Sequence, residues 1–265
     1  MFQRSLFPWY GGKHRLAEWI IAHFPPHDCY VEVFGGAASV LFAKPPSKVE
    51  IYNDIDSGLV NFFRCLRDPD KCKRMVDWLR KTPCSRELYY ESMKLAQDPS
   101  VDDITRAAAW FYIARLSFAG RWGEGWRFST TKNEAATYAD SIDDLTSFQK
   151  RIERVSIDHL DFRECIKRYD GPRTLFYCDP PYHPATRLPK HYKCDLTAAD
   201  HDDLVDLLLK IQGKAVLSGY PCDPYCQLED AGWQRLERKT FAQAQLCKNK
   251  PRSPRTECLW IKRAE

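Results

Sequence analysis

Four adjacent residues near the end of a strand-like run carry the clearest chemical pattern in the sequence. The apolar run 174–178 stops at Asp179, Pro180, Pro181 and Tyr182. Neither proline can donate a hydrogen bond to a sheet, which explains why the strand ends but not why an aspartate precedes and a tyrosine follows. A carboxylate accepts hydrogen bonds, and a tyrosine ring offers a flat face for stacking. A strand end closed by a turn is the alternative interpretation.

Two further motifs follow strand-like segments early in the chain. In YVEVFGGAASV, Gly35 and Gly36 permit a tight turn and a close approach of the backbone to a ligand. The motif lacks the GxGxxG spacing of dinucleotide-binding turns, and a packing turn is the alternative. In IYNDID, Asp54 is the better candidate to accept hydrogen bonds from both hydroxyls of a ribose, whereas Asp56 is suited to cap the next helix.

These features together favour an adenosine ligand that carries no pyrophosphate, and S-adenosylmethionine fits that description. In an open α/β sheet, ligands bind at the carboxyl ends of the strands, where all three motifs are expected to lie. The amino acid end of the cofactor needs charged partners, which PWYGGK, residues 8–13, could supply.

The motifs FPWYGGK, YVEVFGGAASV, IYNDID and DPPY occur in an order that resembles the Dam-type DNA adenine-N6 methyltransferases. The resemblance covers nearly the whole chain, with Val33-Phe34 in place of the family's Pro-Phe as one departure. It implies an enzyme of the EC 2.1.1.72 type that uses S-adenosylmethionine, with Asp161-Phe162 beside the adenine ring of the cofactor. The full set of implied cofactor contacts is Trp9, Tyr10, Gly12, Lys13, Glu32, Phe34, Gly35, Gly36, Ala37, Asp54, Asp161, Phe162 and Asp179.

The resemblance also implies a role for each residue of DPPY. The exocyclic amine of adenine is a poor nucleophile, because its lone pair is delocalised into the ring. The Asp179 carboxylate and the Pro180 carbonyl would accept both amine hydrogens, and Pro181 would help to hold that carbonyl rigid. Tyr182 would stack on a base extruded from the duplex. Neither a metal ion nor a covalent cysteine is expected.

Two alternatives remain open. Cytosine-N4 methyltransferases use a related motif, but more often carry serine at the position of Asp179. A catalytically inactive DNA-binding protein could share the fold, although the intact Asp179, Tyr182, Asp54 and Lys13 argue against it.

The stretch LSFAGRWGEGWRF, residues 116–128, is the expected reader of DNA sequence, because arginine is the commonest reader of guanine. It loosely resembles the recognition hairpin of the family. In the alternative interpretation, its tryptophans pack back on the insertion, and the basic strip 238–255 is a solvated loop rather than a phosphate contact. The expected DNA contacts are Arg115, Gly120, Arg121, Trp122, Trp126, Arg127, Lys248, Lys250 and Arg252.

The elements that must position these residues follow from hydrophobic periodicity. The chain begins with a βαβα order, continues with helices alone and then returns to alternating helices and strands. This order predicts an α/β fold with a doubly wound, mostly parallel sheet of the S-adenosylmethionine-dependent methyltransferase type. The catalytic domain is expected at 1–67 and 146–265, and a helical recognition insertion at 68–145. Expected helices are 14–24, a short one through Leu41, 57–67, 74–80, 86–97, 104–118, 147–154, 164–169, 199–211 and 224–231. Expected strands are 29–34, 49–52, 155–158, 174–178, 214–217 and a terminal hairpin of 234–241 with 257–262.

Composition narrows the class of protein further. With 265 residues, 44% hydrophobic, the chain can bury a large core, and its formal charge of +4 is compatible with nucleic acid. Eleven scattered cysteines, no CxxC pair and no signal peptide predict reduced thiols in a prokaryotic or phage-encoded cytoplasmic protein. No run is long enough to span a membrane. The expected state is a monomer on double-stranded DNA; the sequence leaves open a cognate restriction endonuclease as a second partner.

Overall fold

The computed structural model describes residues 5–186, 194–241 and 254–263. The chain divides into two compact units. The first unit comprises Met1–Arg15, Gly36–Pro45 and Asp56–His159, and the second comprises Leu16–Gly35, Pro46–Ile55 and Leu160–Glu265. The expected recognition insertion, residues 68–145, lies within the first unit.

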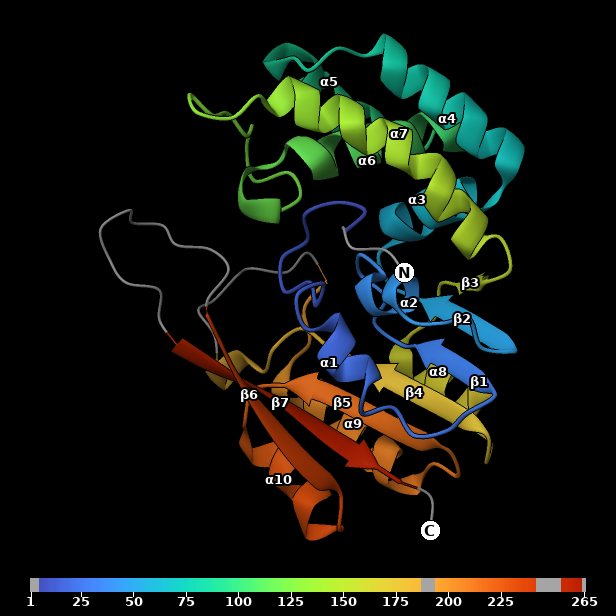
Figure 1. Cartoon of the computed structure of the whole chain (residues 1–265), viewed down its shortest axis with the longest axis vertical. Helices are drawn as coiled ribbons and strands as arrows, with labels where there is room; N and C mark the ends of the chain where they lie inside the picture. Colours follow the sequence, from blue (N-terminus) through green and yellow to red (C-terminus); the bar gives the residue numbers. More distant parts are fainter. Residues whose placement is uncertain (1–4, 187–193, 242–253, 264–265) are drawn as a thin grey trace. The chain divides into compact units, whose positions relative to one another are not determined.

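Within the described residues, seven strands form one mixed, mostly parallel sheet with the order β3-β2-β1-β4-β5-β7-β6 (Figure 1). Strands β1 and β2, β1 and β4, and β4 and β5 pair in parallel, whereas β7 is antiparallel to both β5 and β6. The expected α/β class and terminal hairpin are confirmed. The strands are β1 (Cys29–Glu32), β2 (Val49–Asn53), β3 (Ser156–Asp158), β4 (Thr174–Cys178), β5 (Lys214–Gly219), β6 (Gln234–Phe241) and β7 (Pro254–Lys262).

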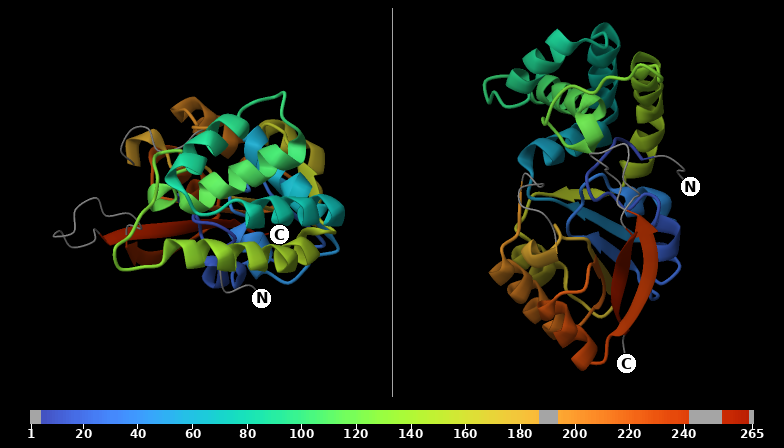
Figure 2. Two further views of the ribbon diagram at one scale, coloured as in Figure 1. Left: turned by 90° about the horizontal axis from the view of Figure 1, so that it is seen from above. Right: turned by 90° about the vertical axis from the view of Figure 1, so that its left-hand side faces the viewer.

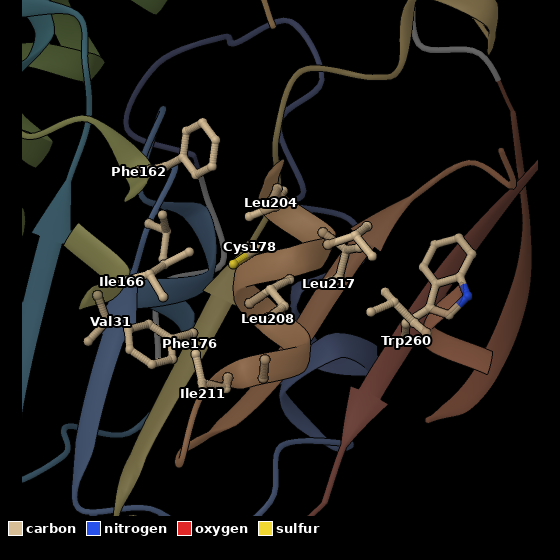
Figure 3. Close-up of a cluster of buried hydrophobic side chains, with 14 of the residues drawn as sticks. Val31, Phe162, Ile166, Phe176, Cys178, Leu204, Leu208, Ile211, Leu217 and Trp260 are labelled. Carbon is tan, nitrogen blue, oxygen red and sulfur yellow. The ribbon is translucent and has the colours of Figure 1, made fainter. Parts of the chain in front are cut away.

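The second unit has its core between the sheet and three helices, α8 (Phe162–Tyr169), α9 (Ala198–Lys210) and α10 (Asp223–Asp230). Figure 3 shows apolar side chains from the central strands meeting those of α8 and α9. Successive strand residues point to opposite faces of a sheet. Tyr30 and Tyr177 accordingly meet Phe24, which follows α1 (Ala17–Ile21), rather than this core.

The first unit is helical, and α6 lies among its neighbours α3, α4, α5 and α7 (Figure 2). Every residue from Ala107 to Ala114 in α6 is buried, which explains why that helix is apolar on all sides. The helices of this unit are α2 (Ser39–Ala43), α3 (Ser57–Arg67), α4 (Pro69–Lys81), α5 (Arg86–Leu95), α6 (Asp103–Leu116), the 3-10 helix η1 (Phe118–Gly120) and α7 (Glu134–Ile152), and the residues of β3 also fall within it. A second 3-10 helix, η2 (Pro184–Thr186), belongs to the second unit.

Most helix starts in the first unit are encoded by capping side chains. Asp56, Asp68, Asp102 and Asn133 accept hydrogen bonds from the first free N–H groups of α3, α4, α6 and α7. These groups would otherwise lack partners, because the first four N–H groups of a helix have no acceptor within it. Ser85 caps α5 in the same way.

Three helices differ from the sequence prediction by three or more residues at one end or both, and the other predicted helices agree to within two residues. Helix α7 begins at Glu134 rather than Ser147, and therefore runs through residue 145. Helix α4 begins at Pro69 rather than Arg74, because Asp68 caps it there. Helix α1 covers only Ala17–Ile21 of the expected 14–24. None of the helices in the described part of the chain has the length and apolar character that a membrane span requires.

Candidate functional site

The carboxyl ends of three adjacent parallel strands, β1, β2 and β4, carry polar residues on one side of the sheet in the second unit. Register pairs Glu32 of β1 with Tyr52 of β2 and with Tyr177 of β4. Asp54 lies two residues after Tyr52, and Asp179 lies two residues after Tyr177. Ligands bind at these strand ends in open α/β sheets. The sheet thus places three of the expected acidic residues on adjacent strand ends.

Glu32 is a buried carboxylate, with 2% of its surface exposed. The hydroxyl of Tyr30 donates to its Oε2 atom at 2.9 Å. Burial and the negative charge of Glu32 raise the pKa of Tyr30 well above its ordinary value, so that the phenol stays protonated and donates. The hydrogen bond from Tyr30 offsets part of the cost of burying this carboxylate.

The turn after β1 tolerates no side chain at two positions. A Cβ atom at Gly35 would lie 2.1 Å from Cε2 of the Tyr52 ring. At Gly36, where φ is +47°, a Cβ atom would lie 2.8 Å from Nε1 of Trp9 in the first unit. Ala37 is buried, and Ala38 has a left-handed conformation at the start of α2. The two glycines are therefore required by close packing in this turn.

Asn53, which the sequence motifs did not mark as a site residue, fixes the backbone next to Asp54. Its side-chain amide donates to the carbonyls of Val33 and Leu160 at 3.0 and 3.1 Å, and its Oδ1 accepts from the Leu160 N–H at 2.9 Å. Only 1% of its surface is exposed. The only signal was its position in IYNDID, beside Asp54. Asn53 thus joins the end of β2 to the turn after β1 and to the segment that precedes α8.

The two aspartates of IYNDID have different surroundings. Asp56 caps α3, with its Oδ1 accepting from the N–H groups of Gly58 and Leu59 at 2.9 and 3.3 Å, which confirms the expected capping role. Asp54 is half-buried and follows the end of β2. Its contact with a ribose stays a prediction.

The segment before α8 combines an aspartate and a phenylalanine. Asp161 is exposed and caps α8 by accepting from the Arg163 N–H at 2.9 Å. Phe162 is buried, its ring centroid 5.6 Å from that of Phe34. The guanidinium of Arg163 lies 4.3 Å from the centroid of the Phe162 ring. Phe34 and Phe162, both expected as cofactor contacts, therefore lie side by side.

Residues 179–182 leave the central strand β4 at its carboxyl end. Pro180 is buried, whereas Asp179, Pro181 and Tyr182 are half-buried. The Tyr182 ring stacks on Tyr220 with centroids 4.1 Å apart and planes at 9°. The hydroxyl of Tyr182 donates to Oε2 of Glu257 at 3.1 Å. The motif therefore presents a carboxylate and a ring that is held in place by its own neighbours.

Cys178, which precedes Asp179, is an inert neighbour. Burial raises the pKa of its thiol well above the ordinary value, and the charges of Cys165 and Asp179 act in the same direction. The thiolate is the nucleophilic form of cysteine. Cys178 therefore stays protonated at neutral pH and serves packing.

The first unit holds the other expected cofactor residues. Lys13 is 4% exposed, and its ammonium donates to the Gly11 carbonyl at 3.3 Å. The Gly12 N–H donates to the Trp9 carbonyl at 3.1 Å, which closes the turn before Lys13. The Trp9 ring lies 6.0 Å from that of Trp110, between centroids. A buried ammonium favours an anionic partner.

The expected recognition stretch is a compact loop of the same unit. An isolated bridge joins Ser117 to Trp126, and the Arg127 N–H donates to the Leu116 carbonyl at 2.7 Å. Gly120, at φ +70°, lies against the backbone of Pro8 and Trp9. The loop is thus packed against residues that precede Lys13.

The tryptophans of this loop point inward. Trp122 stacks on Trp110 with centroids 6.1 Å apart, and its Nε1 donates to the Trp110 carbonyl at 3.2 Å. The Trp126 ring meets Tyr89 edge-on at 5.7 Å. This packing is the alternative that the sequence left open. Their contact with DNA stays a prediction.

The arginines of the loop are also engaged. Arg121 has 15% of its side chain exposed, contacts Glu124 at 3.2 Å and lies 5.3 Å from the centroid of the Tyr10 ring. Arg127 pairs with Glu134 at 3.0 Å. Burial, assisted by the nearby charge of Arg127, lowers the pKa of Arg115 to about 10, so that it stays charged at neutral pH. Lys248, Lys250 and Arg252 lie outside the described residues.

Comparisons with known proteins agree with these motifs. A family model described as D12 class N6 adenine-specific DNA methyltransferase matches residues 9–228. The DNA N-6-adenine-methyltransferase of Escherichia phage P1 is 26% identical over 186 residues, which are 69% of this chain and 24% of that protein. The DNA adenine methylase of Vibrio cholerae O395 is 29% identical over 69% of this chain and 66% of its own length. That of Escherichia coli K12 is 27% identical over 68% of this chain and 66% of its own length. The chain thus spans about a quarter of the phage relative and slightly under two thirds of the bacterial ones.

Proposed function

Since this chain belongs to the family of D12 class N6 adenine-specific DNA methyltransferases, we propose that it methylates the N6 amine of adenine in a specific double-stranded DNA sequence. The single observation that carries the proposal is residues 179–182 at the end of β4, with the Tyr182 ring fixed against Tyr220. The methyl donor is S-adenosylmethionine, which supplies an electrophilic methyl group and its own leaving group when bound.

Asp179 and Pro180 would act on the amine of the target base. A carboxylate oxygen and a carbonyl oxygen that accept one amine hydrogen each favour localisation of the nitrogen lone pair, which makes the amine a better nucleophile. The two acceptors must keep a fixed separation, and adjacent prolines restrict the backbone between them. Orientation set before the reaction lowers the barrier, because it need not be found in the transition state.

Tyr182 would receive the face of the extruded base. Chemistry at a base nitrogen requires that the base leave the stack, and an aromatic face offsets part of the cost of unstacking. The ring is held both by Tyr220 and by the hydrogen bond to Glu257, so it is positioned before the base arrives.

Several of the expected cofactor contacts fit S-adenosylmethionine by chemical type. In the second unit, Glu32 is a buried carboxylate at a strand end, Asp54 is an acid suited to ribose hydroxyls, and Phe34 with Phe162 provides apolar faces for adenine. In the first unit, the buried ammonium of Lys13 is suited to a carboxylate, with Trp9 close by in sequence. The remaining proposed contacts are Tyr10, Gly12, Gly35, Gly36, Ala37, Asp161 and Asp179.

DNA contacts are proposed from two segments. The loop of residues 116–128 would read sequence, with Arg121 as the leading candidate and Arg115, Gly120, Trp122, Trp126 and Arg127 around it. Lys248, Lys250 and Arg252 would contact phosphates, because lysine and arginine supply most of the sequence-independent affinity for DNA.

A labelled-methyl assay tests the proposal. The purified chain is incubated with duplex DNA and methyl-labelled S-adenosylmethionine, and the DNA is digested to nucleosides. Label in N6-methyladenine is the expected result, with none from Asp179→Ala. Label in N4-methylcytosine would replace the proposed target base, and unlabelled DNA would overturn the proposed activity.

A further inference from the structure

Tyr182 is held at two points by residues that its own motif does not include. Its ring face lies 4.1 Å from the Tyr220 ring, with the planes 9° apart, and Tyr220 directly follows β5. Its hydroxyl donates to Oε2 of Glu257, a residue of β7 that lies 75 positions further along the chain. The face contact limits the tilt of the ring, and the hydrogen bond limits its sliding across Tyr220.

Glu257 is itself buried and held in place by a second hydrogen bond. It has 2% of its surface exposed, and its Oε1 atom accepts from the Ser218 hydroxyl of β5 at 2.8 Å. Since β5 lies between β4 and β7 in the sheet, the carboxylate reaches over β5 to the segment that follows β4. The Glu257 carboxylate thus connects β7 to β5 and to the segment that follows β4.

A buried carboxylate is an expensive choice for a merely structural position. Burial of an ionised group costs free energy that hydrogen bonds only partly offset, and apolar residues often replace buried polar groups without loss of stability. Both oxygens of Glu257 are used by hydroxyl donors, one of them from the residue proposed to stack on the target base. The arrangement therefore serves the orientation of Tyr182 better than it serves the fold.

We propose that Glu257 is a positioning residue for methyl transfer, which acts through the Tyr182 hydroxyl to hold the Tyr182 ring against Tyr220 before the base arrives. The inference rests on the proposed function and deepens it. It also explains why position 182 carries tyrosine rather than phenylalanine, because stacking alone needs only the ring.

A double-mutant cycle tests the proposal. Wild type, Glu257→Ala, Tyr182→Phe and the double variant are compared by the single-turnover rate constant for methyl transfer to a saturating duplex. Each single variant is expected to lose about tenfold or more, the scale of a hydrogen bond to a charged group. The double variant should fall within about twofold of the slower single variant, since both changes remove one interaction.

A second readout follows the base rather than the reaction. With 2-aminopurine at the target position of the duplex, extrusion raises fluorescence, and Glu257→Ala and Tyr182→Phe should lower that rise to the same extent. Glu237→Ala is the matched control, because Glu237 lies on β6 opposite Cys258 but is exposed and pairs with Arg235. It should react like wild type. If Glu257→Ala does not fold, Glu257→Gln completes the same cycle.

The outcomes separate the two proposals. If wild type methylates adenine but the rate losses of Glu257→Ala and Tyr182→Phe multiply in the double variant, the two residues act independently. That result overturns the role of Glu257 and leaves the proposed function standing. Rates unchanged by Glu257→Ala do the same. Wild type that transfers no methyl group to adenine overturns the proposed function, and the role of Glu257 with it.

Discussion

Asp179 follows the last residue of β4 and is the residue on which the proposed chemistry depends most. We predict that Asp179→Ala abolishes methyl transfer, because the target amine loses its charged acceptor. The family resemblance also places Asp179 against the cofactor, so some loss of cofactor affinity is expected. Single-turnover kinetics and calorimetry on the same variant measure both effects. Near-normal turnover would rule out the mechanism.

Asp54 and Asp56 form a matched pair for the cofactor site. We predict that Asp54→Ala weakens S-adenosylmethionine binding by about 1.5–3 kcal/mol, the scale of hydrogen bonds to charged groups. Asp56→Ala should instead lower the free energy of unfolding by about 0.5–2 kcal/mol, because Asp56 caps α3. Calorimetric titration and denaturant unfolding of both variants separate the roles. Equal loss of stability from both, with unchanged affinity, would contradict the ribose contact.

Local chemistry made some of these residues readable from sequence alone. The capping role of Asp56 follows from its place just before a helix, and the motif at residues 179–182 from residue types that a strand end does not need. Asn53 and Glu257 were missed, because their roles depend on partners as far away as Leu160 and Tyr182. Burial and pairing across the sheet create such roles, and no local pattern encodes them.

At the scale of elements, the turn after β1 has no space for a side chain at Gly35. We predict that Gly35→Ala lowers the free energy of unfolding by about 1–3 kcal/mol, because its methyl group would overlap the Tyr52 ring. Gly171→Ala is the control, since a Cβ atom there would be at an ordinary contact distance, 3.9 Å, from Oγ1 of Thr174. It should change stability by under about 0.5 kcal/mol. Denaturant unfolding measures both. Equal stability of the two variants would contradict the packing argument.

Element types were more predictable than element ends. The terminal hairpin, β6 with β7, was expected from two strand-like runs, and it forms. The start of α7 was missed, although Tyr138, Ile142 and Leu145 are buried at helical spacing, because charged residues separate them. Helix α1 is short because its last turn gives way to hydrogen-bonded turns at His23 and Phe24, just before two prolines.

At the scale of the whole molecule, the proposed activity requires that the protein recognise a DNA sequence as well as methylate an adenine in it. Arg121 lies over Tyr10 and pairs with Glu124, and it must leave these contacts to reach a base edge. We predict that Arg121→Ala costs about 1–3 kcal/mol in specific binding and relaxes the choice at one base position. Binding to a set of duplexes with single changes measures this. An equal loss for every sequence would show that Arg121 contacts phosphate instead.

Lys250→Ala is the comparison variant for that experiment. A phosphate contact should weaken binding to all sequences alike and reduce the dependence of affinity on salt concentration. Titration of the same duplexes at several salt concentrations distinguishes a residue that contacts bases from one that contacts phosphates. A loss of affinity confined to one DNA sequence would show that Lys250 contacts a base, and would contradict its proposed phosphate contact.

The central claim is adenine methylation in a specific DNA sequence, and sequencing of modified bases tests it most directly. DNA is taken from cells that express wild type and from cells that express Asp179→Ala, in a host that has no adenine methylation of its own. We predict N6-methyladenine at one short recurring sequence in the first sample and none in the second. Methylation of cytosine, or identical DNA in the two samples, would contradict it.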